Sequence, residues 1–197
     1  MQYLLDILGA SIIGMFVIFM IVQFNMQMSE ANQELIMNNM SQFSTVTSSE
    51  IIEYDFYKIG YRVGTSNKFL VAKSNEVEYF ADINNDGSRD SVRYYIGDRQ
   101  RIYEEIEMET SQNPYNRPIY RSVNGGKGEL ISIVRKFEIT YLDSMGVKIP
   151  ENLLINPSKR REIRGLGVYV LTEASEKTGG IYQGTEWRKT IWPKNVN

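Results

Sequence analysis

The N-terminal run of apolar residues limits the folds open to this chain more than any other part of it. Between residues 3 and 24 the only strongly polar side chains are Asp6, Ser11 and Gln23. At 1.5 Å per residue a helix over this run is about 33 Å long, which matches the hydrocarbon thickness of a bilayer, about 30 Å. A secretory signal would begin with basic residues, yet the first Lys or Arg is Lys58. The run therefore predicts one membrane-spanning helix.

The helix is expected to continue well beyond the membrane. Residues 25–59 contain neither Gly nor Pro, and their apolar side chains recur at steps of about three and four residues. This stripe consists of Met28, Ala31, Leu35, Met40, Phe43, Val46 and Ile51 or Ile52. We expect the stripe to pack on a following domain and the helix to end at Gly60. The Ser/Thr-rich stretch 44–49 has low helix propensity and is expected to fray or bend the helix.

Three residues in the apolar run indicate contacts with other helices. Gly9 and Gly14 are small enough to let a neighbouring helix approach closely. Asp6 is an ionisable group in a membrane-length segment and needs a partner, yet no base lies near it in the sequence. We expect Asp6 to pair with the amino terminus of an adjacent copy, so that these three residues form an assembly site.

Composition removes several classes of function. The chain of 197 residues has a formal net charge of -2, which offers no basic field for nucleic acid. It has no Cys and no His, so disulfides, thiolate chemistry, the commonest general base and the commonest metal ligand are absent. We therefore expect no enzyme and no nucleic-acid partner. An anchored enzyme that uses only acids and tyrosines is the remaining alternative in that class.

Residues 60–197 are expected to form one antiparallel β-sheet domain packed on the helix, which gives an α+β fold. Residues 75–83 and 91–97 flank an Asp-Gly turn, the strongest short signal for a hairpin. Further strands are expected at 101–108, at 129–143 as one long or two bent strands, at 165–174 and at 185–193, with an irregular loop at 111–120. The chain thus divides into a membrane half of the helix (1–24), an amphipathic half (25–59) and the globular domain (60–197).

The N-terminal half resembles the type IV pilin and pseudopilin superfamily. Its features are an extreme N-terminal apolar helix with one acid about five residues in, an unbroken amphipathic half and then a β-rich domain. In that family the acid lies at the fifth mature position and pairs with the N-terminal amine of a neighbouring subunit during assembly. Asp6 is the fifth residue if Gln2 is counted first and the sixth if Met1 is counted first. The chain has Asp where Glu is usual, no Pro at the membrane exit and no basic leader ending in Gly. We expect either that a leader was removed before this numbering begins or that the chain is not processed.

The globular half is similar to the J-type minor pseudopilins of type II secretion and to related minor pilins. The stretches that carry this resemblance are, in order, IEYDFYKIGY, FADINNDGSRDSVRYYIG, VRKFEITYLDSMG and WRKTIWPKNVN. The resemblance implies a structural subunit of a pilus or pseudopilus. Such a subunit starts as a single-pass protein of the bacterial inner membrane and polymerises with copies of itself or other pilin-like subunits into a periplasmic or cell-surface filament. The alternative is a single-pass membrane protein that never polymerises and whose β domain binds a ligand or calcium.

The Asp-Gly turn also has the spacing of a calcium loop. Side-chain oxygens at relative positions 1, 3, 5 and 9, with Gly87 at 6 and a backbone carbonyl at 7, match the first part of an EF-hand loop. The candidate ligands are Asp82, Asn84, Asp86, Asp90 and, through its carbonyl, Ser88. Position 12 is Arg93 instead of the closing Glu, so the dissociation constant is expected to be about 10⁻⁴ to 10⁻³ M. The other interpretation is a polar turn that needs Asp-Gly for its positive φ.

Two charged segments suggest contacts without indicating chemistry. Residues 159–165, KRREIRG, are either a solvated loop or a contact for an acidic patch on a neighbour, such as EEIEME at 104–109. The acids of that patch are expected to face solvent. The turn GGKGE lacks the spacing of a phosphate-binding loop, so nucleotide binding is not expected.

Overall fold

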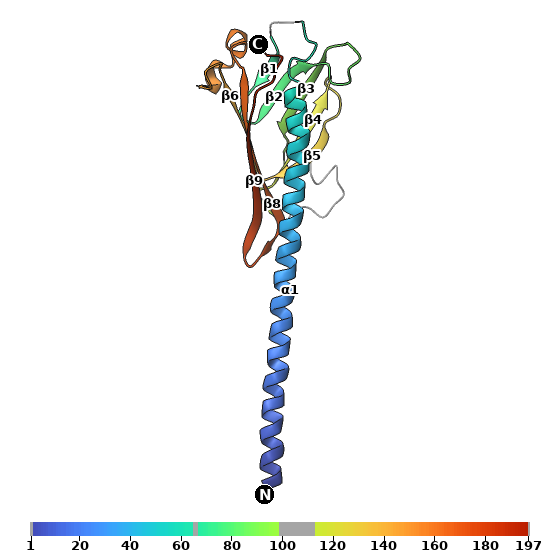
Figure 1. The fold of residues 1–197 in the computed structure, drawn as a ribbon, viewed down its shortest axis with the longest axis vertical. Coiled ribbons are helices and arrows are strands. Elements are labelled where there is room, and N and C mark those ends of the chain that lie inside the picture. The colour runs from blue at the N-terminus through green and yellow to red at the C-terminus, as the bar shows by residue number, and fades with distance from the viewer. Residues whose placement is uncertain (1, 65–66, 99–112, 197) are drawn as a thin grey trace.

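The computed structural model describes residues 2–64, 67–98 and 113–196 and has the expected α+β layout. One long helix enters a β domain that packs around only the C-terminal part of the helix (Figure 1). The first buried residue of the helix is Ser41. The N-terminal part therefore projects from the domain as an isolated helix.

Helix α1 spans Gln2–Tyr57 and is about 84 Å long at 1.5 Å per residue. It continues without a break through residues 44–49, so the expected bend is absent. The hydroxyl of Thr45 bonds to the carbonyl of Ser41 at 2.8 Å, inside the helix. Contacts with the domain outweigh the low helix propensity of this stretch. The helix ends at Tyr57, slightly before the expected end, and Gly60 follows in a turn with a φ of 76°.

Five strands form the first antiparallel sheet, in the order β1-β2-β3-β4-β5. They are β1 (Phe69–Ala72), β2 (Glu76–Ala81), β3 (Asp90–Ile96), β4 (Arg117–Val123) and β5 (Glu129–Val134). The predicted hairpin is confirmed as the β2-β3 pair. The predicted loop at 111–120 is wrong from residue 117 onward, because Pro118 is tolerated as the second residue of β4 and its carbonyl accepts from Gly97 N at 2.9 Å. The strand expected at 101–108 lies outside the described residues.

Four strands form a second antiparallel sheet, in the order β7-β6-β8-β9. They are β6 (Lys136–Leu142), β7 (Lys148–Ile149), β8 (Gly165–Thr178) and β9 (Ile181–Ile191), with a 3₁₀ turn at Glu151–Leu153 and the short helix α3 at Pro157–Arg160. The stretch 129–143 is two strands, because the chain passes from one sheet to the other at Arg135. The β8-β9 hairpin runs along α1 toward its N-terminus, where Gln183 Nε2 lies 3.1 Å from Glu34 Oε1 (Figure 1).

The core lies where the C-terminal end of α1 meets both sheets. Ile52 and Phe56 are fully buried there. The ring of Phe56 packs edge-on against Tyr79 and Tyr94 of the first sheet, with centroids 5.9 and 5.4 Å apart. The same cluster includes side chains of the second sheet, such as Val168. The apolar core therefore holds only the last turns of the helix.

Candidate functional site

The apolar half of α1 is exposed throughout. By length and composition α1 can cross a membrane, and its most apolar stretch is 0% buried within the protein. A Cβ added at Gly9 or Gly14 would meet no atom within 4 Å, so both positions are open to a neighbouring helix. Asp6 is exposed, and no hydrogen bond or ion pair engages it within the described residues.

Hydroxyl groups line the side of α1 that meets the domain between its apolar half and the core. Ser41 Oγ lies 3.2 Å from Thr172 Oγ1 of β8, and Ser44 Oγ lies 3.3 Å from Ser132 Oγ of β5. Thr45 also hydrogen-bonds Thr172. We call these five residues the hydroxyl seam. The stretch that was expected to weaken the helix is the part that docks it on the domain.

The apolar stripe lies on the opposite side of α1. Of its predicted members only Ile52 packs in the core, so the prediction that the stripe packs on the sheet is wrong for the rest. At about 100° per residue the exposed apolar side chains lie roughly 180° from the buried ones. We define the outer face as the exposed residues Leu35, Ile36, Met40, Phe43, Val46, Ile51, Tyr54 and Tyr57. Phe43, at 75% exposure, shows that the domain leaves this side uncovered.

A buried ion pair ties the end of α1 to the first sheet. Asp55 is 3% exposed, and its Oδ2 accepts hydrogen bonds from Arg121 Nε at 2.6 Å and from the Tyr94 hydroxyl at 2.7 Å. Burial and the nearby Asp55 charge raise the pKa of Tyr94 well above its usual value, so the phenol stays a neutral donor. Burial opposes the charged form of Arg121, but the hydrogen bond and charge of Asp55 raise its pKa overall.

The sequence alone does not reveal this ion pair. Asp55 is 66 residues from Arg121 and 39 from Tyr94, so no local pattern links them. The available signal was an acid on the same side of the helix as Ile52 and Phe56, where a carboxylate needs a partner. The pair is structural, because it fixes the rotation of α1 on the sheet.

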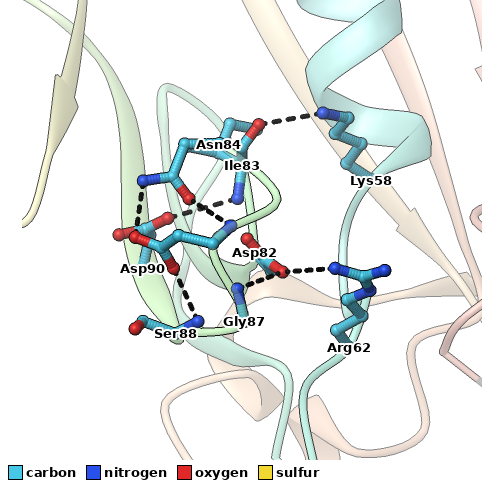
Figure 2. A network of polar contacts seen from close by, with 9 residues as sticks. Lys58, Arg62, Asp82, Ile83, Asn84, Gly87, Ser88 and Asp90 are labelled. Atoms are coloured by element: carbon cyan, nitrogen blue, oxygen red, sulfur yellow. Dashed lines mark hydrogen bonds and ion pairs between the residues drawn. The ribbon is translucent and has the colours of Figure 1, made fainter.

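Asp82 is the buried end of the loop between β2 and β3 (Figure 2). Its side chain is 0% exposed, and Oδ2 accepts from Gly87 N at 3.1 Å. Arg62, which is half-exposed, lies 3.4 Å from the same oxygen. Lys58 of the turn after α1 donates to the carbonyl of Ile83 at 2.9 Å, so the loop rests against the end of the helix.

The other candidate ligands are also held by hydrogen bonds within the turn. Ser88 N donates to Asp86 Oδ1 at 2.6 Å, and this hydrogen bond, together with one from Asn84, lowers the pKa of Asp86. Ile83 N donates to Asp90 Oδ2 at 3.2 Å, and Asn84 Nδ2 donates to Asp86 Oδ2 at 2.8 Å. Within the described residues no three carboxylates converge closely enough to hold a metal ion as they stand. The structure brings the predicted ligands to one turn without closing a site.

The basic segment 159–165 makes contacts inside its own domain. Arg160 Nε donates to Phe69 O at 3.2 Å, and Lys159 Nζ lies 2.9 Å from Glu162 Oε1. These contacts favour a structural role that closes α3 over β1. The acidic segment 104–109 lies outside the described residues.

No family model, curated protein or solved structure matches this chain. What the chain does must therefore be inferred from its own residues. Two features stand out from an ordinary α+β domain. One is a helix whose apolar half and outer face are both uncovered, and the other is a polar loop with a fully buried acid at its base.

Proposed function

We propose that this chain is a pilin-like structural subunit of a type IV pilus or a type II secretion-type pseudopilus, and that it polymerises through α1. The orientation of α1 on its domain carries this proposal. A helix that served only as an anchor and a stalk would bury its apolar side on the domain and expose its hydroxyls. Here the hydroxyl seam is buried, apart from the half-buried Ser44, and the outer face is exposed, so the apolar side is left for another partner.

The outer face continues the exposed surface of the membrane-length half. Residues beyond the span lie in water until something covers them, and burying each large apolar side chain fully is worth about 1.5–3 kcal/mol. Exposed apolar side chains gathered on one side of a helix mark interaction sites, although here the exposed Thr47 and Glu50 lie among them. Equivalent helices packed side by side would cover the outer face and the apolar half together. In such a bundle Gly9 and Gly14 permit close approach of the backbones.

Asp6 would set the axial offset between neighbouring helices in this packing. No basic residue occurs on α1, so the helix cannot neutralise the carboxylate itself. Moving a carboxylate into a helix bundle is costly unless a cation meets it. The N-terminal amine of a neighbouring copy is the cation that repeated subunits supply at a fixed axial offset. Subunits would first be inserted in the bacterial inner membrane. They would then assemble with copies of themselves or other pilin-like subunits into a periplasmic or cell-surface filament.

Substitution of Asp6 tests this proposal. Asp6→Ala should remain folded and membrane-inserted, because Asp6 makes no hydrogen bond or ion pair with the described residues, but it should no longer enter filaments. Glu30→Ala is the matched control, since Glu30 is also exposed on α1 but lies beyond the apolar run. The measurement is the amount of each variant in sheared filaments relative to the membrane fraction. Filament incorporation of Asp6→Ala at the wild-type level would contradict the proposed pairing.

The competing function is a single-pass membrane protein that never polymerises. Electron microscopy of sheared surface material, combined with mass spectrometry of the mature N-terminus, separates the two. Filaments that contain the chain, with a methylated and leaderless N-terminus, would support the pilin-like subunit. Monomeric protein that stays in the membrane under conditions of filament production would favour the competing function.

A further inference from the structure

The loop from Asp82 to Asp90 contains a polar atom whose environment the assembly role does not explain. Oδ1 of Asp82 is buried and has no hydrogen-bond partner within the described part of the chain. Leaving a buried polar atom unpaired costs about 1–3 kcal/mol, and more when the group is charged. Buried polar atoms without a partner often belong to a site for an ion or water. Because Gly87 N and the Arg62 guanidinium both hold Oδ2 of the same carboxylate, Oδ1 is fixed at the base of the loop.

The hydrogen bonds of the loop orient its other oxygens as well. Asp86 and Asp90 each use one carboxylate oxygen to accept a backbone amide, from Ser88 and Ile83 respectively. The second oxygen of each carboxylate is held only by a side-chain amide, from Asn84 in one case and Asn124 in the other. Side-chain amides rotate far more easily than the backbone moves. The polar side chains gather around one turn, as Figure 2 shows for Asp82, Asn84 and Asp90.

We propose that this loop binds one Ca²⁺ through side-chain oxygens of Asp82, Asn84, Asp86 and Asp90 and through the carbonyl of Ser88. On binding, the Asn84 side chain gives up both of its contacts with Asp86, to the backbone amide at 3.1 Å and to Oδ2 at 2.8 Å, and turns its oxygen toward the ion. The carboxylates then close on the ion, which also satisfies Asp82 Oδ1. Calcium accepts six to eight oxygen ligands in a flexible geometry, whereas magnesium requires a tight octahedron that a loose loop does not supply.

The closing ligand of an EF-hand is missing in this loop. Arg93 stands at position 12, where it pairs with Glu76 at 2.6 Å and stacks over the ring of Tyr95. Water must therefore complete the coordination, which places the dissociation constant at about 10⁻⁴ to 10⁻³ M. The site suits a compartment where calcium is abundant.

Isothermal titration calorimetry of calcium binding to the full-length chain in detergent micelles tests the proposal. Asp86→Asn is the informative variant, because Asp86 is exposed and the amide oxygen still accepts the hydrogen bond from Ser88. Asp143→Asn is the matched control, since Asp143 is a partly exposed turn residue whose Oδ1 accepts from Met145 N and Val147 N. Melting curves in chelator should be the same for all three proteins.

We expect one calcium ion per wild-type chain, at least tenfold weaker binding by Asp86→Asn and unchanged binding by Asp143→Asn. Calcium should also raise the melting temperature of the wild-type chain by several degrees, and magnesium should raise it less. No binding up to about 10 mM calcium, or equal binding by wild type and Asp86→Asn, would overturn the proposal. Because solubilised single chains are measured, either result leaves the assembly role of α1 untouched.

Discussion

The two sides of α1 between residues 35 and 57 differ in a way that reverses the usual amphipathic helix. The side that meets the domain begins with the hydroxyl seam and becomes apolar only at Ile52 and Phe56. The outer face, with Phe43 and Tyr54 at its centre, is apolar and exposed. In a soluble domain the apolar side faces the core. The apolar core of the domain thus uses only the end of the helix and leaves the remaining apolar surface of α1 uncovered.

Alkaline pH is expected to have the largest effect, and it acts on the core that packs against the domain side of α1. Tyr79, Tyr94 and Tyr141 are buried in the core, and burial raises their pKa values well above the usual 10.0. In the unfolded chain these phenols ionise near pH 10, whereas the folded chain keeps them protonated. Their contribution to stability is therefore complete below pH 10, and it falls above pH 10 because the unfolded state loses protons first.

Each of these tyrosines should lower the free energy of unfolding by about 1.4 kcal/mol per pH unit above pH 10. The three together give about 4 kcal/mol per unit, against a typical total stability of about 5–15 kcal/mol. We expect cooperative unfolding of the domain to begin above about pH 11, monitored by near-ultraviolet circular dichroism and tyrosinate absorbance. Titration of all three phenols near pH 10 in a domain that stays folded would contradict the expected burial effect.

Two Phe→Ala substitutions on the same helix compare its two sides directly. Phe56→Ala removes a fully buried ring and should lower the free energy of unfolding of the domain by about 3–5 kcal/mol. Phe43→Ala removes a ring that is 75% exposed and should change it by no more than about 0.5 kcal/mol. Denaturant titration of the solubilised chains measures both values, and Phe43→Ala should instead reduce filament formation. Equal destabilisation by the two substitutions would contradict the expected difference between the domain side and the outer face of α1.

The buried ion pair is expected to have the next largest effect. Asp55→Leu removes the close partner of Arg121, which still lies 3.9 Å from the exposed Glu129. The change should cost about 3 kcal/mol, at the lower end for buried pairs because Arg121 is 19% exposed. The double variant Asp55→Leu/Arg121→Met should recover most of that loss. Glu53→Gln is the control two residues away on α1, since Glu53 pairs with the more exposed Lys189, and it should change stability little. A double variant no more stable than Asp55→Leu would show that the charge on Arg121 is not the source of the loss.

The hydroxyl seam is expected to show the smallest effect. Thr172→Val keeps the shape of the side chain but removes the hydroxyl that meets Ser41 and Thr45. Because Thr45 also bonds to the carbonyl of Ser41, the loss should be only about 1 kcal/mol, measured by denaturant titration. A loss as large as that of Phe56→Ala would mean that the seam is a main anchor of the helix.

The long helix and the β2-β3 hairpin could be predicted because local signals suffice for both. An unbroken apolar run and an Asp-Gly turn have few alternative structures. The orientation of α1 could not be predicted, because the hydroxyl partners Ser132 and Thr172 are far away in sequence and an apolar stripe normally faces the core. Strand β4 was missed because Pro118 suggested a loop. The candidate calcium ligands could be selected from their spacing in the sequence. The unpaired Oδ1 of Asp82 could be found only in the structure.

The central claim, that the outer face packs against other copies, can be tested most directly with single cysteines, because the chain contains none of its own. Phe43→Cys places a thiol on the outer face, and Met145→Cys places one at an equally open position, 81% exposed, in the turn after β6. In solubilised single chains a maleimide should label both variants. In assembled material Phe43→Cys should be protected and should form crosslinked dimers on oxidation, while Met145→Cys stays open to label. Equal labelling of the two variants after assembly, without crosslinks at Phe43→Cys, would contradict the claim.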